Sequence, residues 1–120
     1  MKRIPKTKLV TITGEPFKIP SEKEEGKIED CTDLGNLLRL LVFNIPRQNL
    51  TMEDSIRGSN LVQQIKESEG KQVLEIEEAE HDWIKKKVDA VAPMIFAINA
   101  VVIKRALDEF ERAHQPKGKE

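Results

Sequence analysis

Both histidines of this 120-residue chain stand three residues after a glutamate. The two segments are Glu78-Ala79-Glu80-His81 and Glu111-Arg112-Ala113-His114. On a helix, this spacing places a carboxylate and an imidazole on adjacent turns of one face, as in carboxylate-bridged di-iron bundles. Glu78, His81, Glu111 and His114 are therefore candidate metal ligands, and a bridging glutamate would have to come from the second helix or from another subunit.

The same residues also have a simpler interpretation, because each pair lies at the end of an expected helix. Glu78 and His81 fall in a first helical turn, where an acid favours the positive end of the helix dipole. His114 falls in a last turn, where a cation is favoured. Glutamate is abundant in this chain, so the spacing arises easily by chance. We therefore rank a di-iron protein last of three hypotheses and expect no cofactor.

The sequence offers little for nucleophilic catalysis or phosphate binding. Its single cysteine, Cys31, has no histidine close by in the sequence, and the chain contains no Gly-x-Ser-x-Gly motif. The six glycines are scattered rather than gathered in a loop that could cradle a phosphate. We therefore expect a protein that is not an enzyme.

The charge balance argues against a nucleic-acid partner. Lys and Arg number 20 against 21 Asp and Glu, and the formal net charge is −1. Proteins that bind nucleic acids usually carry a basic stripe, because phosphate contacts dominate their affinity. The only tight basic run, residues 85–87, directly follows an acidic stretch and fits a solvated helix with complementary charge at its ends. Aromatic residues make up only 4% of the chain, which leaves few rings for base stacking.

From the pattern of apolar residues we expect a cytoplasmic protein without a membrane partner. No long apolar stretch follows the basic N-terminus, as a signal peptide would require. The most apolar window, residues 88–103, is interrupted by Asp89, Pro93 and Asn99 and is too short to cross a bilayer. If the chain is encoded by a phage, the compartment is the host cytoplasm.

The length fits a single domain spanning residues 1–120. Residues 9–13 and 17–20 are short apolar runs around Gly14, which predict an N-terminal β-hairpin. An alternating segment at 73–77 predicts a third short strand that would pair with this hairpin. The remaining polar segments are expected to be frayed tails at 1–8 and 115–120 and a linker at 21–30.

Helical periodicity predicts about four helices and an α+β, mainly helical fold. The first runs over 32–43 and is apolar over most of its circumference, interrupted only by Asn36 and Arg39. The second begins at Thr51 with a capping box and ends near residue 69, with Gly58 marking a break or a close packing contact. The third begins near residue 78, and Pro93 is expected to begin the fourth, over 94–113.

The fourth helix carries the candidate interface. From residue 94 to residue 103 nearly every position is apolar, and a helix that is apolar all round is buried on all sides. A homo-oligomer or a protein partner would cover its second face more easily than a small monomer. We therefore expect an oligomerising interaction or assembly protein, with Phe96, Ile103, Leu107 and Phe110 as hydrophobic anchors.

The first alternative is a protein that binds a small anionic metabolite or nucleotide in a pocket between subunits. Arg39, Arg47 and Arg57 are the candidate contacts to the anion, because a guanidinium matches carboxylate and phosphate geometry. The second alternative is the di-iron helical protein.

One extended pattern resembles small uncharacterised proteins of tailed bacteriophages. It covers about residues 34–91 and includes the turn Asn44-Ile45-Pro46, a Leu-Thr-x-Glu helix start at residues 50–53, and the segment Leu74-Glu75-Ile76-Glu77-Glu78-Ala79. The resemblance transfers no catalytic residue. It implies a phage origin and a role in assembly or host manipulation.

Overall fold

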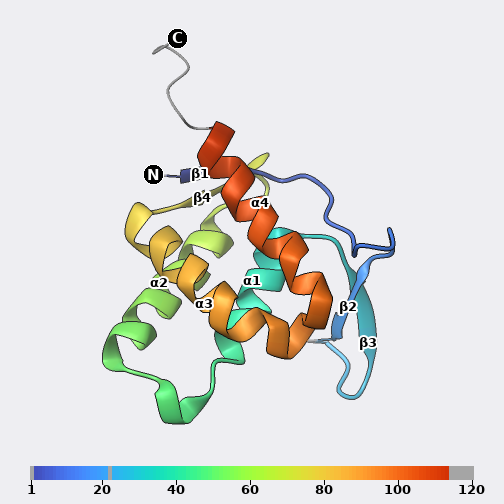
Figure 1. Ribbon diagram of the computed structural model, residues 1–120, viewed down its shortest axis with the longest axis horizontal. Coiled ribbons are helices and arrows are strands. Elements are labelled where there is room, and N and C mark those ends of the chain that lie inside the picture. Colours follow the sequence, from blue (N-terminus) through green and yellow to red (C-terminus); the bar gives the residue numbers. More distant parts are fainter. Residues whose placement is uncertain (1, 22, 114–120) are drawn as a thin grey trace.

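The chain folds as an α+β protein in which helix predominates, as the sequence predicts, and Figure 1 shows its computed structural model. The structure describes residues 2–21 and 23–113. Its strands and helices are, in chain order, β1 (Lys2–Pro5), β2 (Phe17–Pro20), β3 (Ile28–Cys31), α1 (Leu34–Phe43), α2 (Met52–Glu67), β4 (Val73–Ile76), α3 (Glu78–Phe96) and α4 (Ala100–Ala113). Short 3-10 helices lie at Arg47–Asn49 and Ala97–Asn99.

Helix α1 lies at the centre and contacts α2, α3 and α4. Its leucines at 34, 37, 38 and 41 are buried, so the apolar stripe predicted from the sequence is the middle of the core. The helix begins at Asp33, whose carboxylate accepts a hydrogen bond from the backbone N–H of Asn36 (3.2 Å). The sequence placed the start of this helix at residue 32, and the structure places its cap one residue later.

Helix α2 begins with the predicted capping box. The Thr51 hydroxyl accepts from the backbone N–H of Asp54 (3.1 Å), and the Asp54 carboxylate accepts from that of Thr51 (3.0 Å). The helix is unbroken at Gly58, where a Cβ atom would lie 3.1 Å from Val42 and 3.4 Å from Trp83. Of the two readings of Gly58, close packing is therefore the correct one.

The predicted start of the fourth helix at Pro93 is wrong. Helix α3 continues through Pro93 to Phe96, because a proline costs one helical hydrogen bond while Val91, Ala92 and Phe96 stay packed in the core. The break comes at Ala97, which has a positive φ of 52°, and α4 begins at Ala100. A non-glycine residue with positive φ is conformationally strained, so the tight turn here is imposed by the packing of the two helices.

Helices α3 and α4 fold back on each other as an antiparallel pair (Figure 1). Lys85 Nζ lies 3.6 Å from Asp108 Oδ1, and Lys104 Nζ lies 2.6 Å from Asp89 Oδ1. Within the described residues, one helical stretch, Glu78–Asp108, is long and apolar enough to cross a membrane by length and composition alone. One third of its most apolar window is buried, and the turn at Ala97 divides it into the two arms.

The N-terminal hairpin differs from the prediction. Residues 9–13 form a loop closed by hydrogen bonds between Thr11 and residues 14 and 15, with Gly14 at a φ of +90°. Strand β2 pairs instead with β3, with Phe17 opposite Cys31. The pairing follows from burial, because Phe17 and Ile19 alternate inward and Cys31 is buried across from them. The expected linker at 21–30 is therefore the hairpin loop and most of strand β3.

Strand β4 confirms the expected strand near 73–77, but its partner is β1. The segment 1–8, expected to be a frayed tail, thus contains a strand. Ile4 lies opposite Leu74, and both side chains are buried beside α4 and α2. A single inward isoleucine in a basic, polar segment gives little periodic signal, which explains why the sequence did not reveal this strand. The tail expected at 115–120 lies outside the described residues.

Candidate functional site

The structure gives no support to the metal site in the part of the chain that it describes. Glu78 is exposed, whereas His81 on the same helix is fully buried. Glu111 belongs to α4, with a side chain outside the described ones, and His114 lies outside the described residues. Among the described residues, no group of three or more His, Cys, Asp or Glu side chains is placed to hold a metal ion.

The predicted interface anchors are core residues. Phe96, Ile103 and Leu107 are all buried within the single chain, and the ring of Phe96 contacts that of Phe17 edge to face at 5.6 Å. The side chain of Phe110, in α4, lies outside the described ones. Phe96, Ile103 and Leu107 are covered by their own chain, because α3 and α4 pack on each other and α4 also packs against β1 and α1.

The three candidate arginines do not converge on one site. Arg57 on α2 pairs with Glu80 on α3, and Arg47 is exposed in a 3-10 helix after α1. Arg39 is half-buried on α1, with its guanidinium carbon 5.8 Å from the centroid of the Phe43 ring. Arg39 therefore has an aromatic neighbour on its own helix, whereas Arg57 has a carboxylate partner on α3.

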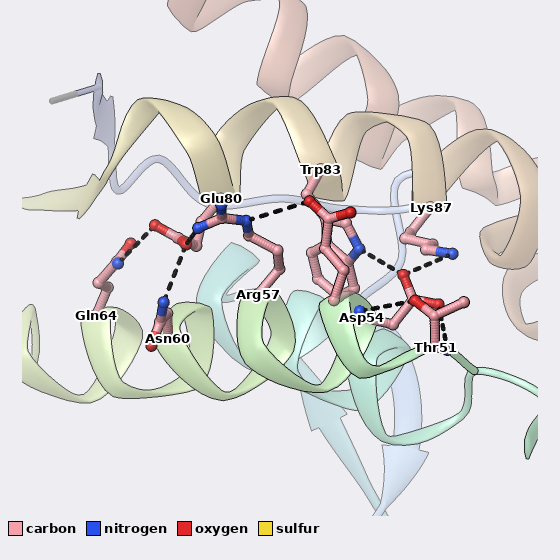
Figure 2. A network of polar contacts seen from close by, with 9 residues as sticks. Thr51, Asp54, Arg57, Asn60, Gln64, Glu80, Trp83 and Lys87 are labelled. Carbon is pink, nitrogen blue, oxygen red and sulfur yellow. Dashed lines mark hydrogen bonds and ion pairs between the residues drawn. The ribbon is translucent and has the colours of Figure 1, made fainter.

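A buried carboxylate, Glu80, joins α3 to α2 (Figure 2). It is 3% exposed and accepts hydrogen bonds from Arg57 Nη1 (2.9 Å), Gln64 Nε2 (3.0 Å) and Asn60 Nδ2 (3.2 Å). Burial alone would raise the pKa of Glu80, but the hydrogen bonds from these three residues outweigh it and lower the pKa below its usual value. Arg57, Asn60 and Gln64 follow the helical spacing i, i+3, i+7, so a polar stripe on α2 was the sequence signal for this contact.

A second buried carboxylate, Asp54, lies at the other end of the contact between α2 and α3 (Figure 2). Its Oδ1 accepts from Trp83 Nε1 (2.9 Å) and lies 3.2 Å from Lys87 Nζ, while Oδ2 accepts the backbone N–H of Thr51. The hydrogen bond from Trp83, followed by that from Thr51, lowers the pKa of Asp54 from 3.8 to about 2. Both ends of the α2–α3 contact therefore depend on ionised carboxylates.

Acid should weaken the fold through Asp54. A carboxyl group whose pKa is lowered by folding contributes stability above its unfolded pKa, and this stability is lost as the pH falls toward the folded value. We expect Asp54 to contribute about 2 kcal/mol to the free energy of unfolding near pH 6 and almost nothing near pH 2. Urea unfolding of the natural protein and of Asp54→Asn, measured at about pH 6, 4 and 2, would give this difference. If the two proteins lose stability in parallel over that range, Asp54 does not have the role assigned to it.

Next to this contact with α3, α2 forms an apolar groove with the end of α1. The groove has a volume of about 410 Å³. Its lining residues are Val42, Phe43, Ile45, Leu50, Asp54, Ser55, Gly58, Ser59, Val62 and Gln63. Asp54 is the only charged residue of this set, and its carboxylate is engaged with Trp83, Lys87 and Thr51. Phe43 stands at the rim with 68% of its surface exposed.

A second apolar area lies at the turn between α3 and α4. Met94 and Ile98 are largely exposed there, and the backbone N–H of Ile12 donates to the Asn99 side chain nearby (3.1 Å). By contrast, the hollow farther along the α3 and α4 arms, about 320 Å³ in volume, is lined by three lysines and three aspartates together with Val88 and Leu107. Part of the apolar stretch 94–103 is therefore exposed at this turn, and a further apolar surface lines the α1–α2 groove.

Comparison of the chain with protein-family models, with curated proteins and with solved structures finds no match. The resemblance to bacteriophage proteins stays a prediction from the sequence pattern.

Proposed function

We propose that this chain is a non-enzymatic assembly protein that pairs with a second copy of itself through the α1–α2 groove. The observation that carries the proposal is Phe43, a large apolar side chain that is 68% exposed at the rim of an apolar groove. Exposed apolar patches on a small soluble domain mark interaction surfaces, and buried aromatic anchors supply much of the energy of an interface.

A second copy is a suitable occupant of the groove because the protruding Phe43 ring and the groove lie on the same face of the chain. In a two-fold pair, each copy presents the same patch to the other, so a protruding side chain needs a recess beside itself. Phe43 protrudes at the end of α1, and the groove beside it is bounded by α2 and Leu50. Each copy can therefore place its Phe43 ring in the groove of the other, and both rings are withdrawn from water at once.

The charge pattern of α2 supports the same surface. Charged residues make up 34% of the chain, but residues 55–65 contain only one, Arg57, which is paired with Glu80. Next to the groove, Met52 and Ile56 are also exposed on α2. Interface cores are depleted of charged residues in this way. The resemblance to phage proteins suggests that such a pair acts as an accessory or assembly factor in the host cytoplasm.

Substitution of Phe43 should separate the pair without unfolding the chain. Because the ring is mostly exposed, Phe43→Ser removes little from the core, whereas loss of both rings from a two-fold interface should weaken pairing at least about thirtyfold. The measurement is the molar mass by light scattering over a dilution series at micromolar concentrations, with thermal unfolding as a check on the fold. Ile98→Ser is the matched control, because Ile98 is 71% exposed at the α3–α4 turn.

The Ile98→Ser control also shows which of the two apolar areas, the α1–α2 groove or the α3–α4 turn, forms the interface. If Ile98→Ser lowers the mass and Phe43→Ser does not, the pair forms through the α3–α4 turn, and the groove is not its interface. If neither natural protein nor variant exceeds the mass of one chain, the proposal of self-association fails.

A further inference from the structure

Each of the two small sheets has two strands, so every strand has one edge that faces no other strand of its sheet. On β3 this edge lies at the outside of the molecule (Figure 1). The Ser21 N–H donates to the Lys27 carbonyl (2.8 Å), which continues the antiparallel pairing of β2 with β3. In such a pair, alternate residues bond to the partner strand and the residues between them point away. The backbone N–H and C=O groups of Ile28 and Asp30 therefore point away from β2.

The outer edges of the other three strands are closed or interrupted. On β4, the outward N–H of Glu75 donates to the hydroxyl of Ser68, the residue that caps the end of α2 (2.9 Å). On β1 and β2, Pro5 and Pro20 occupy outward positions and have no N–H to donate. Natural proteins protect sheet edges from further strands by such devices.

The edge of β3 is open over its first three residues. These residues include no proline, and Ile28, Glu29 and Asp30 are all exposed, Ile28 by 71%. Among the backbone hydrogen bonds between described residues, this edge is closed only after the strand, where the Leu9 N–H donates to the Thr32 carbonyl (2.9 Å). An edge of this kind can accept a further strand, which extends the sheet through backbone hydrogen bonds.

The charge of the β2–β3 hairpin indicates which kind of strand fits this edge. The hairpin contains five acids and three lysines, and Lys18 is paired with Asp30 and Lys27 with Glu24. Among the described residues, Glu29 takes part in no ion pair. If a second copy of β3 bonded to all the outward groups of Ile28 and Asp30, the two copies of Glu29 would lie opposite each other. Like charges at opposite positions destabilise a sheet, so a basic strand fits this edge better than a second copy does.

We propose that the open edge of β3 binds an extended segment of a partner protein, with a basic residue opposite Glu29 and an apolar residue opposite Ile28. The segment runs antiparallel to β3 and exchanges N–H···O=C bonds with Ile28 and Asp30. Side chains at opposite positions lie about 5 Å apart, close enough for both contacts. The edge is not part of the α1–α2 groove, so the inference does not depend on pairing of two copies.

The binding test uses the peptide Thr-Thr-Lys-Val-Thr, blocked at both ends, which places its lysine opposite Glu29 and its valine opposite Ile28. In ¹⁵N-resolved NMR titrations, we expect saturable downfield shifts of the amide protons of Ile28 and Asp30, because both gain an acceptor. The dissociation constant should be on the order of millimolar. Replacement of the peptide's lysine by glutamate should weaken binding about fivefold.

Two N-methylated peptides separate strand pairing from simple charge attraction. Methyl groups on the backbone nitrogens of the second and fourth residues remove the donors that face Asp30 and Ile28. Binding should then fall at least about tenfold, because two hydrogen bonds are lost. A methyl group on the nitrogen of the third residue, which points away from β3, is the matched control and should change the affinity by no more than about twofold.

Two variants test the same contacts from the side of the protein. Ile28→Pro removes an outward donor and no bond to β2, so the chain should stay folded while peptide binding falls at least about tenfold. Glu29→Lys should reverse the charge preference, so that the glutamate peptide binds about fivefold more tightly than the lysine peptide. Phe43→Ser should bind the lysine peptide as the natural protein does, which keeps this result separate from the pairing experiment.

Three results would overturn the inference. Absence of saturable shifts at up to roughly 20 mM peptide would show that the edge accepts no strand of this kind. Equal affinities of the unmodified and the doubly N-methylated peptide would show charge attraction without strand pairing. Shifts of the Ile28 and Asp30 amides on concentration of Phe43→Ser without peptide would identify a second copy as the occupant of the edge.

Discussion

Ile103→Ala should lower the free energy of unfolding by about 3 kcal/mol and leave the molar mass of the protein unchanged. Ile103 is completely buried on α4, so the substitution removes apolar contacts and leaves a cavity among the helices. The substitution lowers the stability of each single chain and not the strength of pairing, because the side chain is covered by its own chain. Urea unfolding gives the stability, and light scattering gives the mass.

Ile98→Ala is the matched control for this experiment. Both isoleucines lie in the same apolar stretch, but Ile98 is 71% exposed, and its truncation should change the stability by about 0.5 kcal/mol or less. If Ile103→Ala instead lowers the molar mass with little effect on the stability of each chain, Ile103 is an interface anchor. That result would contradict the assignment of Ile103 to the core of a single chain.

Glu80→Ala should also cost about 3 kcal/mol of stability. The substitution removes the acceptor that Arg57, Asn60 and Gln64 share. It leaves the two amides without this acceptor and Arg57 with only its 3.8 Å contact to Glu53. Glu80→Gln keeps the shape and one carbonyl acceptor, so it should cost less, about 1 kcal/mol. Chemical unfolding at neutral pH measures both changes.

The neighbouring Glu78 serves as the control for Glu80. It lies in the same first turn of α3 but is exposed, so Glu78→Ala should alter the stability by no more than about 0.5 kcal/mol. A double-mutant cycle between Glu80→Ala and Arg57→Ala should show a coupling, because the two side chains are in direct contact. Equal effects of Glu78→Ala and Glu80→Ala would contradict the buried network.

Local chemistry in the sequence predicted much of the helical structure. Thr51 and Asp54 define the start of α2 by hydrogen bonds within four residues, and the leucines of α1 define its buried stripe by their spacing. The pairing of β1 with β4 brings Ile4 opposite Leu74, seventy residues away, and no local signal specifies such a partner. The same limit applies to β2, whose partner β3 lies in a segment that is polar in sequence.

The candidate site was harder to predict, because exposure depends on the tertiary fold. The apolar stretch 94–103 was expected to be buried or at an interface throughout, but the turn at Ala97 buries Phe96 and leaves Ile98 in water. Phe43 looked like one more residue of the stripe of α1, and only the position of α2 beside it creates the groove. The three candidate arginines looked equivalent in the sequence, and only the fold shows that Arg57 pairs with Glu80 while Arg39 lies beside the β2–β3 hairpin.

The proposed pairing is tested most directly by the molar mass of the natural protein in solution. Light scattering across a dilution series should give twice the 13.7 kDa of one chain at micromolar concentrations, falling toward the single-chain mass on dilution. Phe43→Ser should give the single-chain mass over the same series. A mass of one chain for the natural protein at every concentration, or an undiminished mass for Phe43→Ser, would contradict pairing through the α1–α2 groove.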